Sequence, residues 1–400
     1  MNKHFIKIKL GELTEIIAGG DKPKIFSENK TSINIFPVFA NAEGNNGLLG
    51  YTNLPRIIEP AVTISARGSK VGFAALRKQP FFPIVRLLTL IPKKDKLDVD
   101  YLFYNLKLNR QNGTGSGQPQ ITIPEISEKI ISVPPLLTQQ KIASVLSSLD
   151  SKIELNNRIN AELEAMAKTL YDYWFVQFDF PTPSPAGRAW VGLPYKTSGG
   201  KMVWNEELKR EIPEGWEIGT LLDIANYENG LPCQKFRPNG AGFLRVIKIR
   251  EMNEGFSSNT ELVRTDIPAK AIIENGDVLF SWSASLDVKI WTGGKGALNQ
   301  HIFKITSNNY PKSFYFYQLL NYLQHFKMMA ENRKTTMGHI TQEHLKQSRI
   351  VIPPIQFTLD LEKIIAPLFS KKVINEIENQ KLAELRDWLL PMLMNGQVKV

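Results

Sequence analysis

The sequence predicts a mixed α+β protein that contains one architecture twice, a globular domain followed by a long helix. Two observations predict it: the chain repeats itself at a constant step, and each copy ends in a long stretch almost free of Gly and Pro. The length of 400 residues also exceeds what one hydrophobic core usually serves. The hydrophobic fraction of 42% and the charged fraction of 22% are those of a globular protein.

The repeat is clearest around two Pro-Pro pairs. Pro134-Pro135 follows Ile131-Ser132-Val133, and Pro353-Pro354 follows Ile350-Val351-Ile352, a step of 219 residues. The same step relates Ile142 to Leu361, Leu149 to Leu368, Leu163 to Leu382, Leu170 to Leu389, and Ile121-Thr122 to Ile340-Thr341. Upstream, shorter steps relate residues 10–13 to 218–221 and 61–65 to 277–281. The constant step implies one gapless element, and the shorter steps imply variable loops between fixed anchors.

Each globular domain is predicted to alternate short strands with helices. Apolar β-like runs at 61–65 and 87–91 precede an aromatic-rich segment at 101–108, and runs at 277–282, 288–291 and 301–305 precede a segment at 314–323. Stretches rich in Pro, Gly and Ser at 181–187 and 198–200 predict a connecting loop. The predicted organisation is a globular domain at 1–137, a central helix at 138–180, a linker at 181–213, a second globular domain at 214–356 and a distal helix at 357–400.

The two long helices are predicted to share a heptad seam. Thr138 and Thr358 are placed to cap their N-termini, and Pro391 is expected to bend or end the second helix. In the first helix, steps of four and three link Ile142, Leu146, Leu149, Ile153, Asn156, Asn160, Leu163, Ala167, Leu170 and Trp174. In the second helix they link Leu361, Ile365, Leu368, Lys372, Asn375, Asn379, Leu382, Arg386 and Leu389.

Asparagines stand at the centre of both seams. A buried amide needs a polar partner, so it fixes the register of a helix pair at some cost in stability. The hypothesis is that the two helices pair as an antiparallel coiled coil with pseudo-twofold symmetry, which would bring Asn156 and Asn160 to Asn375 and Asn379. In the alternative interpretation these four side chains are exposed to solvent.

The charge balance indicates polyanions as the first partners to consider. Lys and Arg outnumber Asp and Glu by 49 to 39, which gives a net charge of +10. The single cysteine, Cys233, excludes an intramolecular disulfide and predicts a reducing compartment. Charged residues interrupt the apolar residues of the N-terminus, and no other apolar run is long enough to span a membrane. We therefore expect a cytoplasmic protein without a membrane partner.

Four segments together resemble a known family. They are Ile131 to Leu136, Ser147 to Asn156, Ser198-Gly199-Gly200-Lys201-Met202-Val203-Trp204, and Ile212-Pro213-Glu214-Gly215-Trp216. They resemble the specificity subunits of type I restriction-modification systems, and the resemblance covers nearly the whole chain. It implies two target recognition domains that each read one half of a split site in double-stranded DNA, with paired helices that hold the domains apart.

The resemblance also implies partners that carry the chemistry. Members of the family dock two modification subunits, which methylate adenine N6 with S-adenosylmethionine, and restriction subunits driven by ATP and Mg²⁺. This chain is accordingly expected to be no enzyme and to bind no cofactor or metal itself. Its residues agree with that expectation: the sequence contains no Asn-Pro-Pro or Asp-Pro-Pro, its Gly-Lys pairs lack a following Ser or Thr, and no Pro-Asp precedes Glu28-Asn29-Lys30 or Glu207-Leu208-Lys209. His339 and His344 lack the thiols or carboxylates of a metal site.

Candidate DNA-reading residues lie in loops that follow the predicted strands. Arg, Lys, Asn and Gln read base edges or neutralise phosphates, and small polar residues hold the backbone. In the first domain the candidates are Arg67, Ser69, Lys70, Gln118, Gln120 and Thr122. In the second they are Trp282, Ser283, Lys295, Asn299, Gln300, His301, Arg333, Lys334, Thr336, His339 and Thr341. We expect Arg67 to contact a guanine, and Lys70, Lys289 and Lys295 to contact phosphates.

Three alternatives remain open at the level of the sequence. The chain could serve a related system in which a single partner both cuts and methylates DNA. It could instead be a DNA-binding structural scaffold that does not read sequence, or an enzyme whose site is unrecognised. Binding that ignores DNA sequence would favour the scaffold, and a cluster of titratable residues would favour the enzyme.

Overall fold

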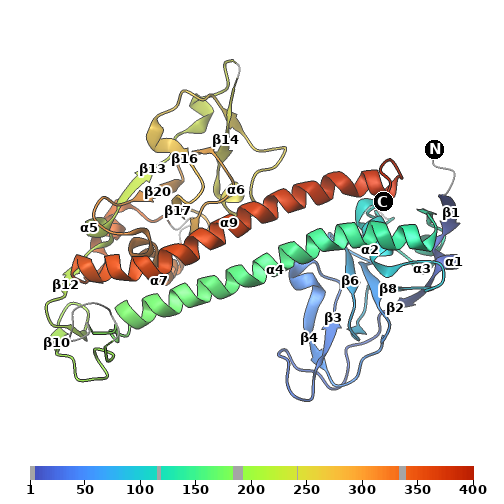
Figure 1. Ribbon diagram of the computed structural model, residues 1–400, viewed down its shortest axis with the longest axis horizontal. Coiled ribbons are helices and arrows are strands. Elements are labelled where there is room, and N and C mark those ends of the chain that lie inside the picture. The colour runs from blue at the N-terminus through green and yellow to red at the C-terminus, as the bar shows by residue number, and fades with distance from the viewer. Residues whose placement is uncertain (1–4, 115–118, 183–191, 241, 333–338) are drawn as a thin grey trace. The chain divides into compact units, whose positions relative to one another are not determined.

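The computed structural model describes residues 5–114, 119–182, 192–240, 242–332 and 339–400. The chain divides into two compact units, Met1–Glu154 with Lys381–Val400, and Leu155–Gln380. Each unit contains one globular domain and one end of each of two long helices, α4 (Leu136–Phe175) and α9 (Ile355–Met394) (Figure 1).

The first unit is built on an antiparallel sheet with the order β2-β8-β5-β6. Its strands are Thr14–Ala18, Leu87–Pro92, Ala61–Ser65 and Ala74–Arg77, and helix α2 (Val99–Leu108) packs against it. A smaller sheet has the order β4-β3-β7, formed by Leu48–Thr52, Phe36–Phe39 and Phe82–Pro83. Strand β1 (Ile6–Lys9) pairs with β9 (Ile130–Val133), and the short helices are α1 (Leu10–Leu13), η1 (Gly44–Gly47) and α3 (Ile123–Ser127).

The second unit repeats this plan. Its main antiparallel sheet has the order β13-β20-β17-β18, formed by Asn226–Asn229, Ile302–Thr306, Val278–Ser281 and Asp287–Ile290. The smaller sheet, β15-β14-β19-β16, comprises Leu262–Val263, Leu244–Ile247, Gly296–Leu298 and Ile272–Ile273. Strand β12 (Glu217–Gly219) pairs with β21 (Ile350–Ile352). The remaining helices are α5 (Leu221–Ile224), η2 (Cys233–Lys235), α6 (Ile249–Glu254), η3 (Ala269–Ala271), α7 (Lys312–Asn332) and α8 (Gln342–Gln347).

The duplication therefore extends from the helices to both sheets. In each unit the main sheet joins its first, fourth, second and third strands in that order, and the smaller sheet contains one parallel pair, β3 with β7 or β14 with β19. The upstream step predicted from sequence was wrong by three residues. Ile8 pairs with Ile131 and Gly219 with Ile350, so Leu10 corresponds to Leu221. At this place the two copies have in common the spacing of the buried residues of α1 and α5, which is the spacing of a helix.

The linker contains more structure than a connecting loop. Strands β10 (Met202–Asn205) and β11 (Arg210–Pro213) form an antiparallel hairpin. Trp216, which follows the hairpin, packs on Phe178 and Phe180 beyond the end of α4. The connecting loop that the Pro-, Gly- and Ser-rich stretches predicted did not include this aromatic cluster.

One glycine in each unit lets the two sheets approach each other. A Cβ on Gly19 would lie 2.0 Å from the carbonyl oxygen of Ile84, and a Cβ on Gly230 would lie 2.3 Å from that of Leu298. The residues that follow, Gly20 and Leu231, form parallel bridges at these places. Both contacts are with backbone, so a side chain cannot be accommodated by a change of rotamer.

Both long helices begin before the threonines predicted to cap them. Thr138 and Thr358 lie within the first turn, and the Thr358 hydroxyl donates to the carbonyl of Ile355 at 2.7 Å. Pro391 does not end α9, which continues to Met394. Burial explains this, because Leu393 and Met394 are held in the core of the first unit.

The two helices run antiparallel where they contact each other. In the second unit, Asn156 Nδ2 donates to Asn379 Oδ1 and Asn375 Nδ2 donates to Asn160 Oδ1, both at 2.9 Å. Residue numbers rise along α4 as they fall along α9, which defines the direction. Asn156, Asn160 and Asn375 are buried, so the structure brings the seam asparagines together and places three of them out of solvent.

The apolar seam positions flank these amides. Leu149, Leu163, Leu368 and Leu382 are half-buried. In the first unit, Arg386 Nη1 lies 2.6 Å from Asp150 Oδ1, and the Tyr104 hydroxyl donates to Asp150 Oδ2 at 2.7 Å. The polar seam residue Arg386 thus has a partner on α4.

Replacement of Asn375 by Leu should leave Asn160 Oδ1 without its donor. We expect Asn375→Leu to lower the free energy of unfolding by about 1–3 kcal/mol, the usual cost of an unsatisfied buried polar atom. The double variant Asn160→Leu/Asn375→Leu should recover most of this loss, because neither amide remains. Urea denaturation of the four proteins of the cycle measures both effects, and a double variant that loses the sum of the single losses would contradict the amide pairing.

Gly19→Ala should destabilise the first unit. Its Cβ would overlap a backbone carbonyl, and overpacking of this kind costs ~1–3 kcal/mol or more. Gly44→Ala is the matched control, because a Cβ on Gly44 would meet nothing within 4 Å. Thermal unfolding followed by circular dichroism should show a lower midpoint for Gly19→Ala alone. Equal midpoints for the two variants would contradict the close approach.

Candidate nucleic-acid interface

Two loops of the first unit that are candidates for DNA reading lie side by side. The Gly68 N–H donates to the carbonyl of Pro119 at 3.1 Å, and the Ile121 N–H donates to the carbonyl of Ala66 at 2.8 Å. These bonds form an antiparallel bridge between Arg67 and Gln120. The fold thus brings together two polar side chains that are far apart in the sequence.

The side chains of these loops differ in exposure and in partners. Ser69, Lys70 and Gln120 are exposed, whereas Arg67 is half-buried. Lys70 Nζ lies 2.7 Å from Glu43 Oε2, and the hydrogen bond from Lys70 lowers the pKa of the Glu43 carboxyl. The Nε of Arg67 is buried and has no hydrogen-bond partner among the described residues. An arginine with an unsatisfied donor is suited to receive an acceptor from a ligand.

Thr122 and Thr341 cap short helices. Thr122 Oγ1 donates to Glu125 Oε2 at 2.8 Å at the start of α3, and Thr341 Oγ1 lies 3.1 Å from His344 Nδ1 at the start of α8. Both side chains belong to capping boxes, which satisfy the free amides of a helix N-terminus. Capping accounts for their recurrence in both copies of the repeat.

In the second unit Trp282 takes the place that Ala66 has in the first unit. The Ile340 N–H donates to the carbonyl of Trp282 at 2.9 Å, as Ile121 does in the first unit. The ring centroid of Trp282 lies 5.6 Å from that of His301 and 5.6 Å from that of His339. Its Nε1 donates to Asn229 Oδ1 at 3.0 Å. The two imidazole rings are inclined at 48° and 51° to the Trp282 ring, and His339 is exposed, so the cluster offers an aromatic ring together with imidazole groups.

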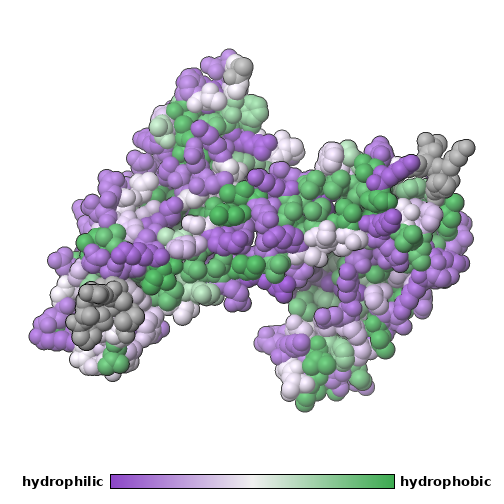
Figure 2. Space-filling model, in the orientation of Figure 1, coloured by the Kyte–Doolittle hydropathy of each residue, from purple (hydrophilic) through white to green (hydrophobic). Residues whose placement is uncertain are grey.

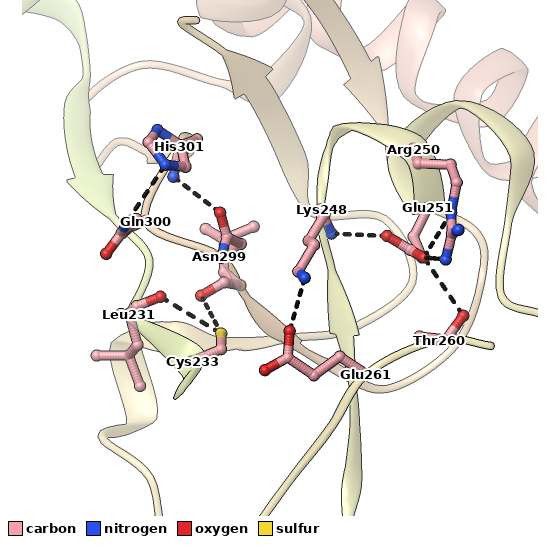
Figure 3. Close-up of polar contacts among 11 residues, drawn as sticks. Leu231, Cys233, Lys248, Arg250, Glu251, Thr260, Glu261, Asn299, Gln300 and His301 are labelled. Atoms are coloured by element: carbon pink, nitrogen blue, oxygen red, sulfur yellow. Dashed lines mark hydrogen bonds and ion pairs between the residues drawn. The ribbon is translucent and has the colours of Figure 1, made fainter. Parts of the chain in front are cut away.

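The chain between β19 and β20 supplies three further candidates, which Figure 3 shows with their polar contacts. Asn299 is buried, and its Oδ1 accepts from the His301 N–H at 3.3 Å. Gln300 Nε2 lies 3.3 Å from His301 Nε2, and His301 Nδ1 is buried without a hydrogen-bond partner among the described residues. Gln300 and His301, which are half-buried, are therefore better placed than Asn299 for contact with a ligand.

Other candidate residues are less accessible to a ligand. Ser283 is buried, at 4% exposure. Burial raises the pKa of the Cys233 thiol, which contacts the carbonyls of Leu231 and Leu298, to about 11, so this thiol is an inert packing group. Four further candidates lie outside the described residues: Gln118, Arg333, Lys334 and Thr336.

The candidate phosphate-binding lysines of the second unit each have an acidic neighbour. Lys295 Nζ lies 3.6 Å from Glu274, and Lys289 Nζ lies 3.4 Å from Asp287. Lys289 also donates to Asn253 Oδ1 at 2.7 Å. The Lys295 pair is exposed and contributes little stability, so a phosphate can displace its carboxylate at low cost, whereas the Lys289 pair is half-buried.

A cleft lies near the candidate loops of the first unit. It has a volume of about 760 Å³ and is lined by β6, α2 and α4, with Tyr104 and Asp150 among its residues. In the second unit the corresponding place, between Tyr317 of α7 and α9, is filled by Phe369, whose ring lies 5.6 Å from that of Tyr317. Phe369 stands one repeat step from Asp150. The two units therefore share a backbone plan and differ in the chemistry of this surface.

Three residues of the interface were not found from the sequence. Asn41, Glu43 and Asn229 contact candidates only through the tertiary fold, and no local motif marks them. Within the described ranges, no three His, Cys, Asp or Glu side chains are grouped so that they could hold a metal ion. No helix in the same ranges is long and apolar enough to cross a membrane.

The hydropathy of the surface agrees with a candidate interface that consists mainly of polar side chains. Hydrophilic residues cover much of the face of the molecule shown in Figure 2, interrupted by smaller apolar areas. Exposed apolar side chains on the long helices include Leu155, Met166, Ile374 and Trp388.

Comparison with known proteins finds relatives that are specificity subunits of type I restriction enzymes. The specificity subunit of the type I restriction enzyme MjaIX from Methanocaldococcus jannaschii is 26% identical over 368 residues, which cover 86% of this chain and 79% of the relative. The specificity subunit of the type I restriction enzyme HindI from Haemophilus influenzae is 27% identical, over 70% of this chain and 71% of the relative.

The fold has a counterpart among solved structures. The S subunit of a type I restriction-modification system from M. genitalium matches with a TM-score of 0.65, covering 98% of this chain and 97% of that one. At 16% identity this likeness concerns the fold alone. Residues 2–165 and 213–387 match the family described as the type I restriction modification DNA specificity domain. With both halves of its duplicated fold matched, the chain belongs to this family and contains two tandem copies of its domain.

Proposed function

We propose that this chain is the non-catalytic subunit that gives a type I restriction-modification complex its DNA sequence specificity. Each globular domain reads one half of a bipartite site in double-stranded DNA. The observation that carries the proposal is the equivalent placement of polar loops in the two units. In the first unit the segment after β5 is hydrogen-bonded to the segment before the capped helix α3. In the second unit the segment after β17 is hydrogen-bonded to the segment before the capped helix α8.

The long helices act in this proposal as a spacer in the form of an antiparallel coiled coil. The amide pairs between α4 and α9 support an antiparallel arrangement with a fixed register. Each helix has 40 residues and is therefore about 60 Å long at 1.5 Å per residue. One turn of B-DNA is roughly 34–36 Å, so helices of this length suit the separation of two half-sites.

The chemistry belongs to partner subunits in this proposal. Two modification subunits dock on the helices and domains and methylate adenine N6 with S-adenosylmethionine, and restriction subunits use ATP and Mg²⁺. This chain binds neither cofactor and determines the DNA sequence on which the complex acts. The names of the relatives support the division of roles, since each is a specificity subunit of a restriction enzyme.

Co-expression with the modification subunit encoded beside it tests the function directly. Mapping of N6-methyladenine in the host DNA should reveal a split motif methylated on both strands. A chain without its second unit should not support methylation at that motif. Methylation at unrelated sites, or binding that ignores sequence at all salt concentrations, would favour a structural scaffold instead.

Arg67→Ala should relax the choice of base at one position of one half-site. A bidentate contact between arginine and guanine contributes roughly 1–3 kcal/mol of discrimination. The methylated fraction at sites that differ from the motif by one base pair measures the change. Arg110→Ala is a suitable control, because Arg110 is an exposed arginine near this loop whose Nε donates to the carbonyl of Val71. Unchanged discrimination in Arg67→Ala would make Arg67 a phosphate contact.

Replacement of Lys70, Lys289 or Lys295 by Gln should weaken binding to all sequences alike. Each phosphate contact that is lost should reduce the slope of log affinity against log salt by about 0.9. Lys209→Gln is the control, because Lys209 pairs with Glu206 in the linker hairpin at 2.8 Å. Filter binding of the complex over a range of NaCl concentrations measures the slope, and a loss confined to the cognate sequence would contradict this role.

A further inference from the structure

The side chain of Asn41 holds the backbone of Arg67 on one side. Asn41 Nδ2 donates to the carbonyl of Arg67 at 2.8 Å, and the Arg67 N–H donates to Asn41 Oδ1 at 3.2 Å. A carboxamide has the same donor and acceptor as a peptide group. Asn41 therefore provides the pair of hydrogen bonds that a neighbouring β-strand would provide.

The other side of the same segment is also held. The carbonyl of Ala66 and the N–H of Gly68 pair with residues 119–121, so consecutive residues bond alternately to the two sides. The backbone around Arg67 is thus fixed from both sides, as in the centre of a sheet, although it lies beyond the end of β5. This fixes the direction of the Arg67 Cα–Cβ bond.

The loop that carries Asn41 makes a second contact with the same segment. Glu43, two residues later, pairs with Lys70 at 2.7 Å. The chain between β3 and β4 therefore contacts residues 67–70 in two places. Residues 67–70 thus have a backbone that is fixed before any ligand arrives, and this backbone carries an arginine whose buried Nε has no hydrogen-bond partner among the described residues.

Among the described residues of the second unit, no amide stands at the equivalent position. The equivalent position, counted from the ends of strands β3 and β14, is Ile249, which begins helix α6. There the residue that corresponds to Arg67 is the buried Ser283, and the residue before it, Trp282, donates from its side chain to Asn229. The arrangement around Asn41 is therefore a feature of the first domain.

We propose that Asn41 is a positioning residue that sets which base pair Arg67 contacts in the first half-site. This inference rests on the proposed function, because it assigns to Asn41 the geometry of a DNA-reading side chain. Asn41 itself need not touch DNA. Its loss frees the backbone of residues 66–68 on one side, and Arg67 then samples several directions.

The test compares Asn41→Ala, Arg67→Ala and the double variant in the co-expressed complex, with the N6-methyladenine pattern as the readout. Asn41→Ala should reduce discrimination roughly tenfold at the base pair that Arg67→Ala affects, the order expected for loss of one good base contact. The double variant should match Arg67→Ala, because a mispositioned and an absent arginine are equivalent. Asn41→Ser, a smaller perturbation, should have an intermediate effect.

Asn34→Ala is the matched control. Asn34 is also an amide that bonds within the first unit, to Ser27 Oγ at 3.1 Å, and its loss should alter stability without altering base choice. Thermal unfolding identifies any variant that fails to fold, and in that case Asn41→Ser decides. If the wild-type complex methylates no split motif, the proposed function fails. If it does, and Asn41 variants keep full discrimination or weaken all sequences alike, the positioning role alone is overturned.

Discussion

The core of the first unit is closed by the other end of the chain, and the rest of the structure depends on this constraint. Leu390, Leu393 and Met394 of α9 lie in the same core as Leu146 of α4 and Tyr101 of α2. At the opposite end of α4, Tyr171 and Trp174 enter the core of the second unit with residues of α7 and α9. The two helices are therefore parts of both cores. Long-range contacts of this kind make assembly depend on the whole chain.

The helix pair combines apolar ends with a polar centre. A fully apolar seam would stabilise the pair without selecting a register, whereas buried amides are satisfied in few registers. Asn156, Asn160 and Asn375 meet this condition in the second unit, and Arg386 with Asp150 provides a charged counterpart in the first. Register matters because it determines which residues at each end reach the two cores.

Duplication conserved the backbone plan and allowed the surfaces to diverge. The same place in the two units carries Asp150 beside an open cleft or Phe369 in a filled one. The segment after the second strand of the main sheet carries Ala66 and the half-buried Arg67 in one unit. In the other it carries Trp282, between two histidines, and the buried Ser283. A fold that fixes the ends of its loops can thus change the chemistry that the loops present.

The sequence by itself determined the duplication, the mixed α+β class, the two long helices and the family. These features were predictable because a constant step, heptad spacing and the main strand patterns are local or repeat within the chain. Cap positions were not, since Thr138 and Thr358 lie in first turns that begin at Leu136 and Ile355, and Pro391 is tolerated where Leu393 and Met394 are buried. Helix ends depend on what the last turns pack against.

The tertiary structure decided which polar residues form the candidate interface. The sequence identified Arg67 and Gln120 as candidates, but only the fold joins them and adds Asn41, which no motif marks. It also gives Thr122 and Thr341 a capping role and buries Ser283. The physical reason is that hydrogen bonds between distant segments depend on backbone positions, and these are fixed only when both sheets and both helices have packed.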